Sequence, residues 1–283
     1  MKKKHKPYEI IGKNTSNLKN FNKYIPIYNK YGVLVFRNFF KYDDIYETFY
    51  NDIFKLVKSI KIKKKNKLNK NLNLNELITE VSKTNRKEIG YIYDLGTKPL
   101  KLISGIKLKS HPKILGMINS LMKKNSIIAN PYLGDTLHIF PPGIENFKHN
   151  LPMHQDYPYI MQSPEQITCY INLGELKKDG NGGIKVWIGS HKEGVTKSNK
   201  NQQDLRITKN SKYFKDNFKS ENFYFDKFDF AIFNSLLQHQ GIQNHSECTR
   251  IVQLIRYSNL NNKESLSYHW QSTEGKKKKK IKF

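Results

Sequence analysis

The sequence has few cysteines and no long apolar run. Its 283 residues contain only two cysteines, Cys169 and Cys248, and no C-x-x-C motif, so a reducing cytoplasm is the simplest compartment. No stretch approaches the ~20 apolar residues that a membrane helix needs. The N-terminal residues 'MKKKHKPYEIIGKN' have the charge of a signal peptide, but no apolar segment follows them. We therefore expect a cytoplasmic protein without a membrane span.

Acidic residues are scarce beside basic ones. Lys and Arg number 50 against 24 Asp and Glu, which gives a formal net charge of +26. Such an excess can attract nucleic acid, acidic membranes or anionic substrates. However, lysines and asparagines cluster in the same segments, as in 'KIKKKNKLNKNLNLNE', which is typical of composition bias. Aromatic residues do not alternate with the basic residues of these segments, as a surface that binds single-stranded nucleic acid would require. We expect a small-molecule substrate, of an anionic class if the charge is functional, and no nucleic acid partner.

The length allows one large domain or two small ones, and we favour one. Residues 1–25 form a basic lead-in, residues 26–270 form the domain, and residues 271–283 form a Lys-rich tail. Within the domain we expect helical support over about residues 41–125 and a strand-rich core over about residues 130–260. The sequence makes no prediction of oligomeric state.

The first half of the domain carries one predicted strand and two predicted helices. Residues 31–40 have the β-branched and aromatic density of a strand. Asp43 and Asp44 can cap the helix that follows. Its apolar residues recur at helical spacing and should face the core: Ile45, Phe49, Ile53, Leu56 and Ile60. A second helix is predicted from about residue 111 to 124, with Pro112 in its first turn.

The second half alternates short apolar runs with turn signals. The runs are 'TLHIF', 'ITCYINL', 'IKVWIGS', 'FDFAIFN' and 'TRIVQLIRY'. Several strands at such spacing indicate a β-sandwich or barrel, so the predicted fold class is mainly β with flanking helices. The Lys/Asn-rich segment 61–75 receives no assignment.

A candidate metal site lies in this strand-rich half. His154, Gln155 and Asp156 are consecutive, and side chains two apart on a strand face the same side. Two histidines and one carboxylate leave three positions open on a metal, which suits Fe(II) binding both a chelating 2-oxo acid and dioxygen. His239 and His245 compete as the third ligand. We favour His239, because it ends an apolar run, whereas His245 lies in the polar turn 'GIQNHSE' and is expected at the surface.

Three segments together resemble the phytanoyl-CoA dioxygenase family of Fe(II)/2-oxoglutarate oxygenases. They are 'LPMHQDYPY', 'NGGIKVWIGSHKEG' and 'FDFAIFNSLLQHQGIQNHSECTRIVQLIRY'. The resemblance extends over about residues 30–260. It implies a double-stranded β-helix, which is a distorted, cupin-like jelly roll, and a hydroxylase that consumes Fe(II), 2-oxoglutarate and dioxygen and releases succinate and CO2.

The resemblance also assigns residues. By matching position, His154, Asp156 and His239 are the implied iron ligands, and Arg250, eleven residues after His239, binds the distal carboxylate of 2-oxoglutarate. The chemistry supports the arginine independently, because a guanidinium binds a carboxylate through two parallel hydrogen bonds and stays charged. Alternation along 'TRIVQLIRY' places this cation on an apolar inner face, where a structural Asp or Glu is the alternative partner.

Further assignments follow from matching positions. Thr136 and Asn172 correspond to positions that hold the cosubstrate. Gly241 stands where many members have a serine, so one hydroxyl contact is missing. His138 is expected on an inner strand near the site, and His191 in a turn away from the metal. Asp156 corresponds to the carboxylate that related halogenases replace to admit chloride, so its presence favours hydroxylation.

Other functions compete with this one. Arg250 and Arg256 are six apart, as in nucleic-acid dealkylases of the same superfamily, but Val252 and Leu254 replace the Asn and Thr expected between them. A non-catalytic jelly-roll binding protein would retain the ligands only structurally. Zn(II)-dependent hydrolysis would use the same ligands but does not explain Arg250.

Overall fold

The computed structural model of the protein describes most of the predicted core. The described residues are 6–11, 21–59, 72–84, 102–123, 127–129, 137–140, 142, 151–157, 164–175, 180, 182–197, 208–259 and 262. The predicted cosubstrate residue Thr136 and most of segment 61–75 lie outside them.

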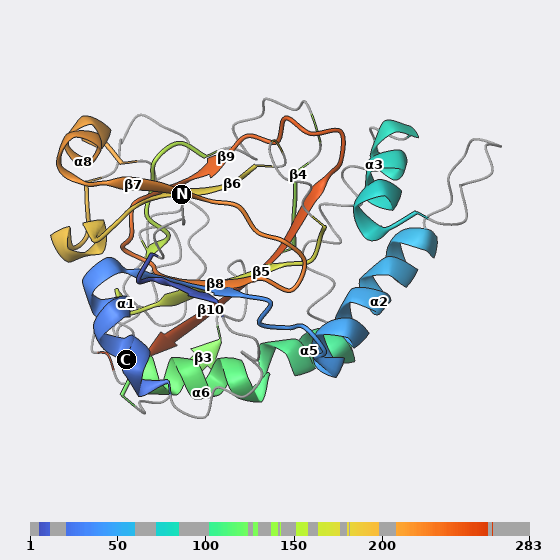
Figure 1. The fold of residues 1–283 in the computed structure, drawn as a ribbon, viewed down its shortest axis with the longest axis horizontal. Helices are drawn as coiled ribbons and strands as arrows, with labels where there is room; N and C mark the ends of the chain where they lie inside the picture. Colours follow the sequence, from blue (N-terminus) through green and yellow to red (C-terminus); the bar gives the residue numbers. More distant parts are fainter. Residues whose placement is uncertain are drawn as a thin grey trace, which may run out of the picture.

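Two sheets form the centre of the fold (Figure 1). In the described part of the chain the large sheet has the order β1-β2-β8-β5-β10-β3, and β4 also pairs with β10. Only β1 and β2 are parallel to each other. The strands are β1 (Glu9–Ile11), β2 (Val33–Arg37), β3 (Ile127–Ala129), β4 (Leu137–Phe140), β5 (Ile167–Asn172), β8 (Phe230–Asn234) and β10 (Arg250–Asn259).

The small sheet has the order β7-β6-β9 and is antiparallel. Its strands are β6 (Gly183–Trp187), β7 (Ser220–Phe223) and β9 (His239–Ile242). Apolar side chains of both sheets share one core cluster, so the sheets pack face to face. The arrangement is a double-stranded β-helix, and the predicted fold class is confirmed.

Four helices cover the outer face of the large sheet: α1 (Ile25–Tyr31), α2 (Asp44–Ser59), α5 (Ile103–Lys109) and α6 (Pro112–Leu121). Helix α3 (Leu74–Thr84) lies at the end of the sheet where β10 begins, and α8 (Ser211–Asn217) lies beside the small sheet. Strand β8 shows the two faces directly, because Phe230 and Ile232 belong to the helix-side core, and Ala231 and Phe233 to the core between the sheets. Burial on both faces explains the nearly continuous apolar runs of the central strands.

Both predicted helices are confirmed. The Asp43 carboxylate caps α2 by accepting a 3.1 Å hydrogen bond from the Tyr46 N–H. The same carboxylate lies 2.9 Å from His111 Nε2 and 3.3 Å from Lys113 Nζ, so it joins the first turns of α2 and α6. Pro112 stands in the first turn of α6, as predicted.

The buried stripe of α2 differs in part from the predicted one. Its buried residues are Tyr46, Phe49, Ile53 and Val57, whereas Ile45 and Leu56 are only partly buried. The predicted stripe is therefore right about Phe49 and Ile53 but misses Val57 and Tyr46, whose hydroxyl reaches the Asn172 carbonyl at 2.8 Å. Its last predicted member, Ile60, lies outside the described residues. None of the helices in the described ranges is long and apolar enough to span a membrane.

Candidate metal centre

Backbone pairing brings the two ligand-bearing segments together. His154 forms an isolated antiparallel bridge with His239, the first residue of β9. The His154 N–H donates to the His239 carbonyl at 2.9 Å, and the reverse bond is 3.0 Å long. The Asp156 N–H donates to the Ser235 carbonyl at 2.9 Å. These bonds join two segments that are far apart in the sequence, since His154 and His239 are separated by 85 positions.

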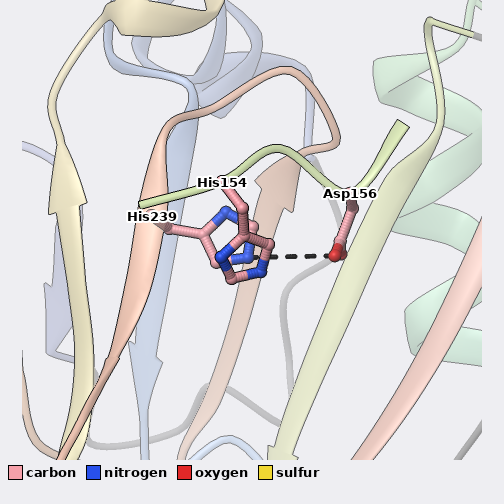
Figure 2. A group of neighbouring side chains, drawn as sticks. All are labelled: His154, Asp156 and His239. Carbon is pink, nitrogen blue, oxygen red and sulfur yellow. Dashed lines mark ion pairs between the residues drawn. The ribbon is translucent and has the colours of Figure 1, made fainter. Parts of the chain in front are cut away.

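The three predicted ligands converge on one point (Figure 2). One candidate ligand atom from each of His154, Asp156 and His239 lies within 4.8 Å of the others. Their residues are 5%, 2% and 6% exposed, respectively. Asp156 Oδ1 lies 3.9 Å from His239 Nε2. The group can therefore present two imidazole nitrogens and one carboxylate oxygen to a single ion.

Hydrogen bonds orient both imidazole rings. His154 Nδ1 lies 2.7 Å from the Pro152 carbonyl, and His239 Nδ1 lies 2.9 Å from the Leu237 carbonyl. A carbonyl can only accept, so each Nδ1 is the donor, and in the neutral ring Nε2 keeps its lone pair. That tautomer is the one that ligates a metal through Nε2.

The two oxygens of Asp156 have different surroundings. Oδ2 accepts hydrogen bonds from Thr168 Oγ1 at 2.8 Å and from Arg256 Nε and Nη2 at 3.1 and 3.0 Å. Oδ1 is the oxygen that faces His239. The carboxylate is thus held at one oxygen and offers the other to the ion. The sequence prediction missed Thr168 and treated Arg256 only as part of a spacing.

The donor set fits Fe(II). Two imidazoles and one carboxylate, all buried and with second-sphere hydrogen bonds in place, form the ligand set of non-haem Fe(II) oxygenases. The described part of the chain contains no other group of three His, Cys, Asp or Glu side chains close enough to hold a metal.

A cavity of about 110 Å³ extends from the triad to Arg250. The arginine is 1% exposed. Its Nη1 donates to the Gly183 carbonyl at 2.8 Å and approaches the Ile242 carbonyl at 3.5 Å, and the guanidinium lies 3.9 Å from the ring centre of Phe140.

The guanidinium of Arg250 has no anionic partner in the part of the chain that the structure describes. No carboxylate of these residues forms an ion pair with it, and its buried Nε has no hydrogen-bond partner among them. Burial lowers the pKa of Arg250, an effect that Tyr170 partly opposes. A buried cation of this kind calls for an anion in the cavity.

Tyr170 is a site residue that the sequence prediction missed. It lines the cavity, and its buried hydroxyl has no partner in the described part of the chain. Burial raises the pKa of Tyr170, and the nearby Arg250 charge opposes this. The signal was the period-two alternation along 'ITCYIN', which places Thr168 and Tyr170 on one face of β5.

Asn172 shares that face but does not line the cavity. Its Nδ2 donates to the Gly174 carbonyl at 2.6 Å and the Phe225 carbonyl at 3.3 Å. Its role in cosubstrate binding stays a prediction, as does that of Thr136.

His138, His191 and His245 lie where the sequence placed them. His138 on β4 lines the cavity, and His245 is exposed. His191 lies away from the triad in the 3-10 turn Ser190–Glu193, with Nε2 3.1 Å from the Asn29 carbonyl. Gly241 also lines the cavity.

Comparison with known proteins decides the family. The model of the phytanoyl-CoA dioxygenase (PhyH) family matches residues 28–252. The chain belongs to the phytanoyl-CoA dioxygenase family. No curated protein matches this PhyH member in sequence.

Solved structures share the fold of this PhyH member at low sequence identity. The epimerase SnoN, in complex with Fe3+, alpha ketoglutarate and nogalamycin RO, has a TM-score of 0.60 and 9% identity, and 93% of each chain is covered. EctD from S. alaskensis, in its apoform, has a TM-score of 0.54 and 13% identity, covering 85% of this chain and 77% of that one. The apo non-heme monooxygenase ThoJ has a TM-score of 0.52 and 14% identity, covering 86% and 78%.

Proposed function

We propose that this protein is an Fe(II)- and 2-oxoglutarate-dependent dioxygenase that hydroxylates a small anionic substrate and releases succinate and CO2. Residues 26–270 would act as one catalytic domain. The observation that carries the proposal is the shared cavity, because it joins a His-Asp-His triad to a buried cation, Arg250, that pairs with no described carboxylate. The free cysteines Cys169 and Cys248 fit the cytoplasmic location that we also propose.

In this proposal the triad holds Fe(II) through His154 Nε2, Asp156 Oδ1 and His239 Nε2. Bound Fe(II) would supply open positions for 2-oxoglutarate and dioxygen and would activate dioxygen, the oxidant of the reaction, for C–H hydroxylation. Arg250 would bind the distal carboxylate of 2-oxoglutarate, using Nε while Nη1 stays on the Gly183 carbonyl. Tyr170, in the same cavity, would add a hydroxyl.

The protein's own contribution is orientation and exclusion of water. The Pro152 and Leu237 carbonyls fix the ring tautomers. Thr168 and Arg256 occupy Asp156 Oδ2, which favours ligation through one oxygen. Apolar residues of the cavity wall limit water near the reacting atoms: Phe140, Leu151, Ile184, Phe233, Val252 and Leu254.

Hydroxylation is the finer part of the proposal, and Asp156 supports it. Its carboxylate occupies the position that a halide would need on the metal. Because the solved structures that share this fold include an epimerase, identifying the product is what distinguishes hydroxylation from another reaction. The substrate class is argued from the net charge of +26.

The test is succinate formation by the Fe(II)-loaded protein in the presence of 2-oxoglutarate, dioxygen and candidate substrates. Each anionic candidate is paired with its neutral ester or amide, and His154→Ala serves as the inactive control. We expect the anion alone to stimulate succinate release and to gain one oxygen atom. A product without added oxygen would refute hydroxylation, and equal stimulation by the neutral partner would refute an anionic substrate.

A further inference from the structure

Two buried glutamines lie next to the three metal ligands in the sequence. Gln155 stands between His154 and Asp156, and Gln238 immediately precedes His239. Both glutamines are 0% exposed. Because neighbouring residues on an extended chain point to opposite sides, these amides lie behind the ligands, on the side away from the metal. What they bind there therefore decides how the ligand segments are held.

Gln155 uses its full hydrogen-bonding capacity. Its Nε2 donates to the Leu236 carbonyl at 2.6 Å and to the Gly194 carbonyl at 2.9 Å. Its Oε1 accepts from the Thr196 N–H at 2.9 Å and from Thr196 Oγ1 at 3.0 Å. An amide offers two donors and two acceptor sites, so this side chain has one satisfied orientation. Gln155 is thereby locked to the chain that precedes His239 and to Thr196.

Gln238 binds the same threonine. Its Nε2 donates to Thr196 Oγ1 at 3.1 Å, and its Oε1 accepts from Thr208 Oγ1 at 2.5 Å. The Thr208 N–H in turn donates to the carbonyl of Met153, the residue before His154, at 2.9 Å. The Thr196 hydroxyl therefore donates to one glutamine and accepts from the other. A single oxygen atom joins the residues that flank all three ligands.

We propose that Thr196 is a positioning residue of the metal centre, whose hydroxyl fixes the His154–Asp156 segment relative to His239. The inference rests on the proposed function in that it presumes a metal at the triad. The front of the site is held by the backbone bridge between His154 and His239. On that side the restraints on the two segments are backbone bonds, including the one from the Asp156 N–H to the Ser235 carbonyl. The Gln155–Thr196–Gln238 chain adds a side-chain link on the opposite side, behind the ligands, and so restrains the two segments from both sides.

The test compares Thr196→Val, which removes the hydroxyl, with Thr196→Ser, which keeps it. The probe is Co(II), titrated under anaerobic conditions and followed by its ligand-field absorption. We expect Thr196→Val to weaken Co(II) binding by about 10- to 100-fold and to alter the ligand-field spectrum, whereas Thr196→Ser stays within about threefold of the parent. Thr48→Val is the matched control, because the Thr48 hydroxyl binds the Asp44 carbonyl on the exposed face of α2, away from the triad.

The outcomes separate the two proposals. If the parent protein does not bind Co(II), the proposed function fails. If the parent binds Co(II) and Thr196→Val binds it equally well with the same spectrum, the positioning role is refuted, even if thermal unfolding of the metal-free variant occurs at a lower temperature. Equal losses in Thr196→Ser and Thr196→Val would also refute it, because the hydroxyl would not be responsible. If Thr196→Val does not fold, Thr196→Ala, which removes the same hydroxyl with a smaller side chain, carries the same expectation.

Discussion

The buried ion pair between Arg256 and Asp156 predicts a stability effect that depends on metal. Arg256 is 4% exposed and Asp156 is 2% exposed, and two hydrogen bonds of 3.1 and 3.0 Å join them. Replacing Arg256 by Met removes the cation and leaves the carboxylate buried. Breaking one side of a buried pair typically costs about 3–5 kcal/mol of unfolding free energy. We expect a loss of this size in the metal-free protein.

Metal binding should restore part of the unfolding free energy that Arg256→Met loses. An ion bound at Asp156 Oδ1 replaces the positive charge of Arg256, so the metal-loaded Arg256→Met protein should be less destabilised than the metal-free one. The assay is urea unfolding of parent and variant, each with and without saturating Co(II). We expect the increase in unfolding free energy on adding metal to be larger in Arg256→Met than in the parent by more than about 1 kcal/mol.

The chain offers a matched control for this assay. Arg37 contacts Asp229 at 2.6 Å, and the Asp229 side chain is 3% exposed. This pair lies among β1, β2 and the start of β8, away from the triad. Arg37→Met should therefore be destabilised equally with and without Co(II). If Arg256→Met also shows the same loss in both conditions, the reasoning that links its charge to the metal through Asp156 is wrong.

Four further predictions follow from the site and the α2 cap. Arg250→Met should raise the Kd for 2-oxoglutarate by about 10- to 150-fold in calorimetry, since one charge-assisted hydrogen bond contributes about 1.5–3 kcal/mol. Tyr170→Phe should raise the same Kd by about fivefold, as expected for one neutral hydrogen bond. His154→Ala should abolish Fe(II)-dependent succinate release. Burial alone would raise the pKa of Asp43, but hydrogen bonds from His111 and the α2 backbone outweigh it and lower the pKa to about 2. Because this folded-state pKa lies below the ordinary value, the ionised carboxylate stabilises the fold at neutral pH by about 1–2 kcal/mol after allowance for solvent screening. That contribution should be lost as the pH falls from about 4 towards 2.

Each of these predictions has a contrary result. An unchanged Kd in Arg250→Met would remove the cosubstrate anchor, and an unchanged Kd in Tyr170→Phe would confine that hydroxyl to a packing role. Succinate release by His154→Ala would place the metal elsewhere. Asp43→Asn should abolish the acid-dependent loss; if acid unfolding in urea has the same pH profile in parent and Asp43→Asn, the cap does not contribute as described.

The sequence was sufficient for the parts of the site that depend on residue type and spacing. His154 and Asp156 are two apart and so face one way on an extended segment, and Arg250 is a charged residue in an alternating apolar strand. The strands of the core follow from short apolar runs bounded by turn signals, and the first turn of α2 follows from its capping residue, Asp43.

The missed residues depend on how distant segments meet. Arg256 reaches Asp156 because β10 pairs with β5 in the register that sets Arg256 opposite Thr168, and no local pattern specifies that register. Thr196 joins two glutamines from segments on either side of it in the chain, which is a property of the folded loop. Tyr46 is more deeply buried than Ile45, because its hydroxyl reaches the carbonyl of Asn172 across the core.

The central claim is that one cavity binds both Fe(II) and 2-oxoglutarate. The most direct test is anaerobic titration of the Fe(II)-loaded protein with 2-oxoglutarate, followed by the weak visible metal-to-ligand charge-transfer band of the chelate. We predict a saturable band in the parent protein, no band in His154→Ala, and a band that requires far more 2-oxoglutarate in Arg250→Met. Folded, iron-loaded parent protein that develops no band would contradict the account and favour a non-catalytic binding protein.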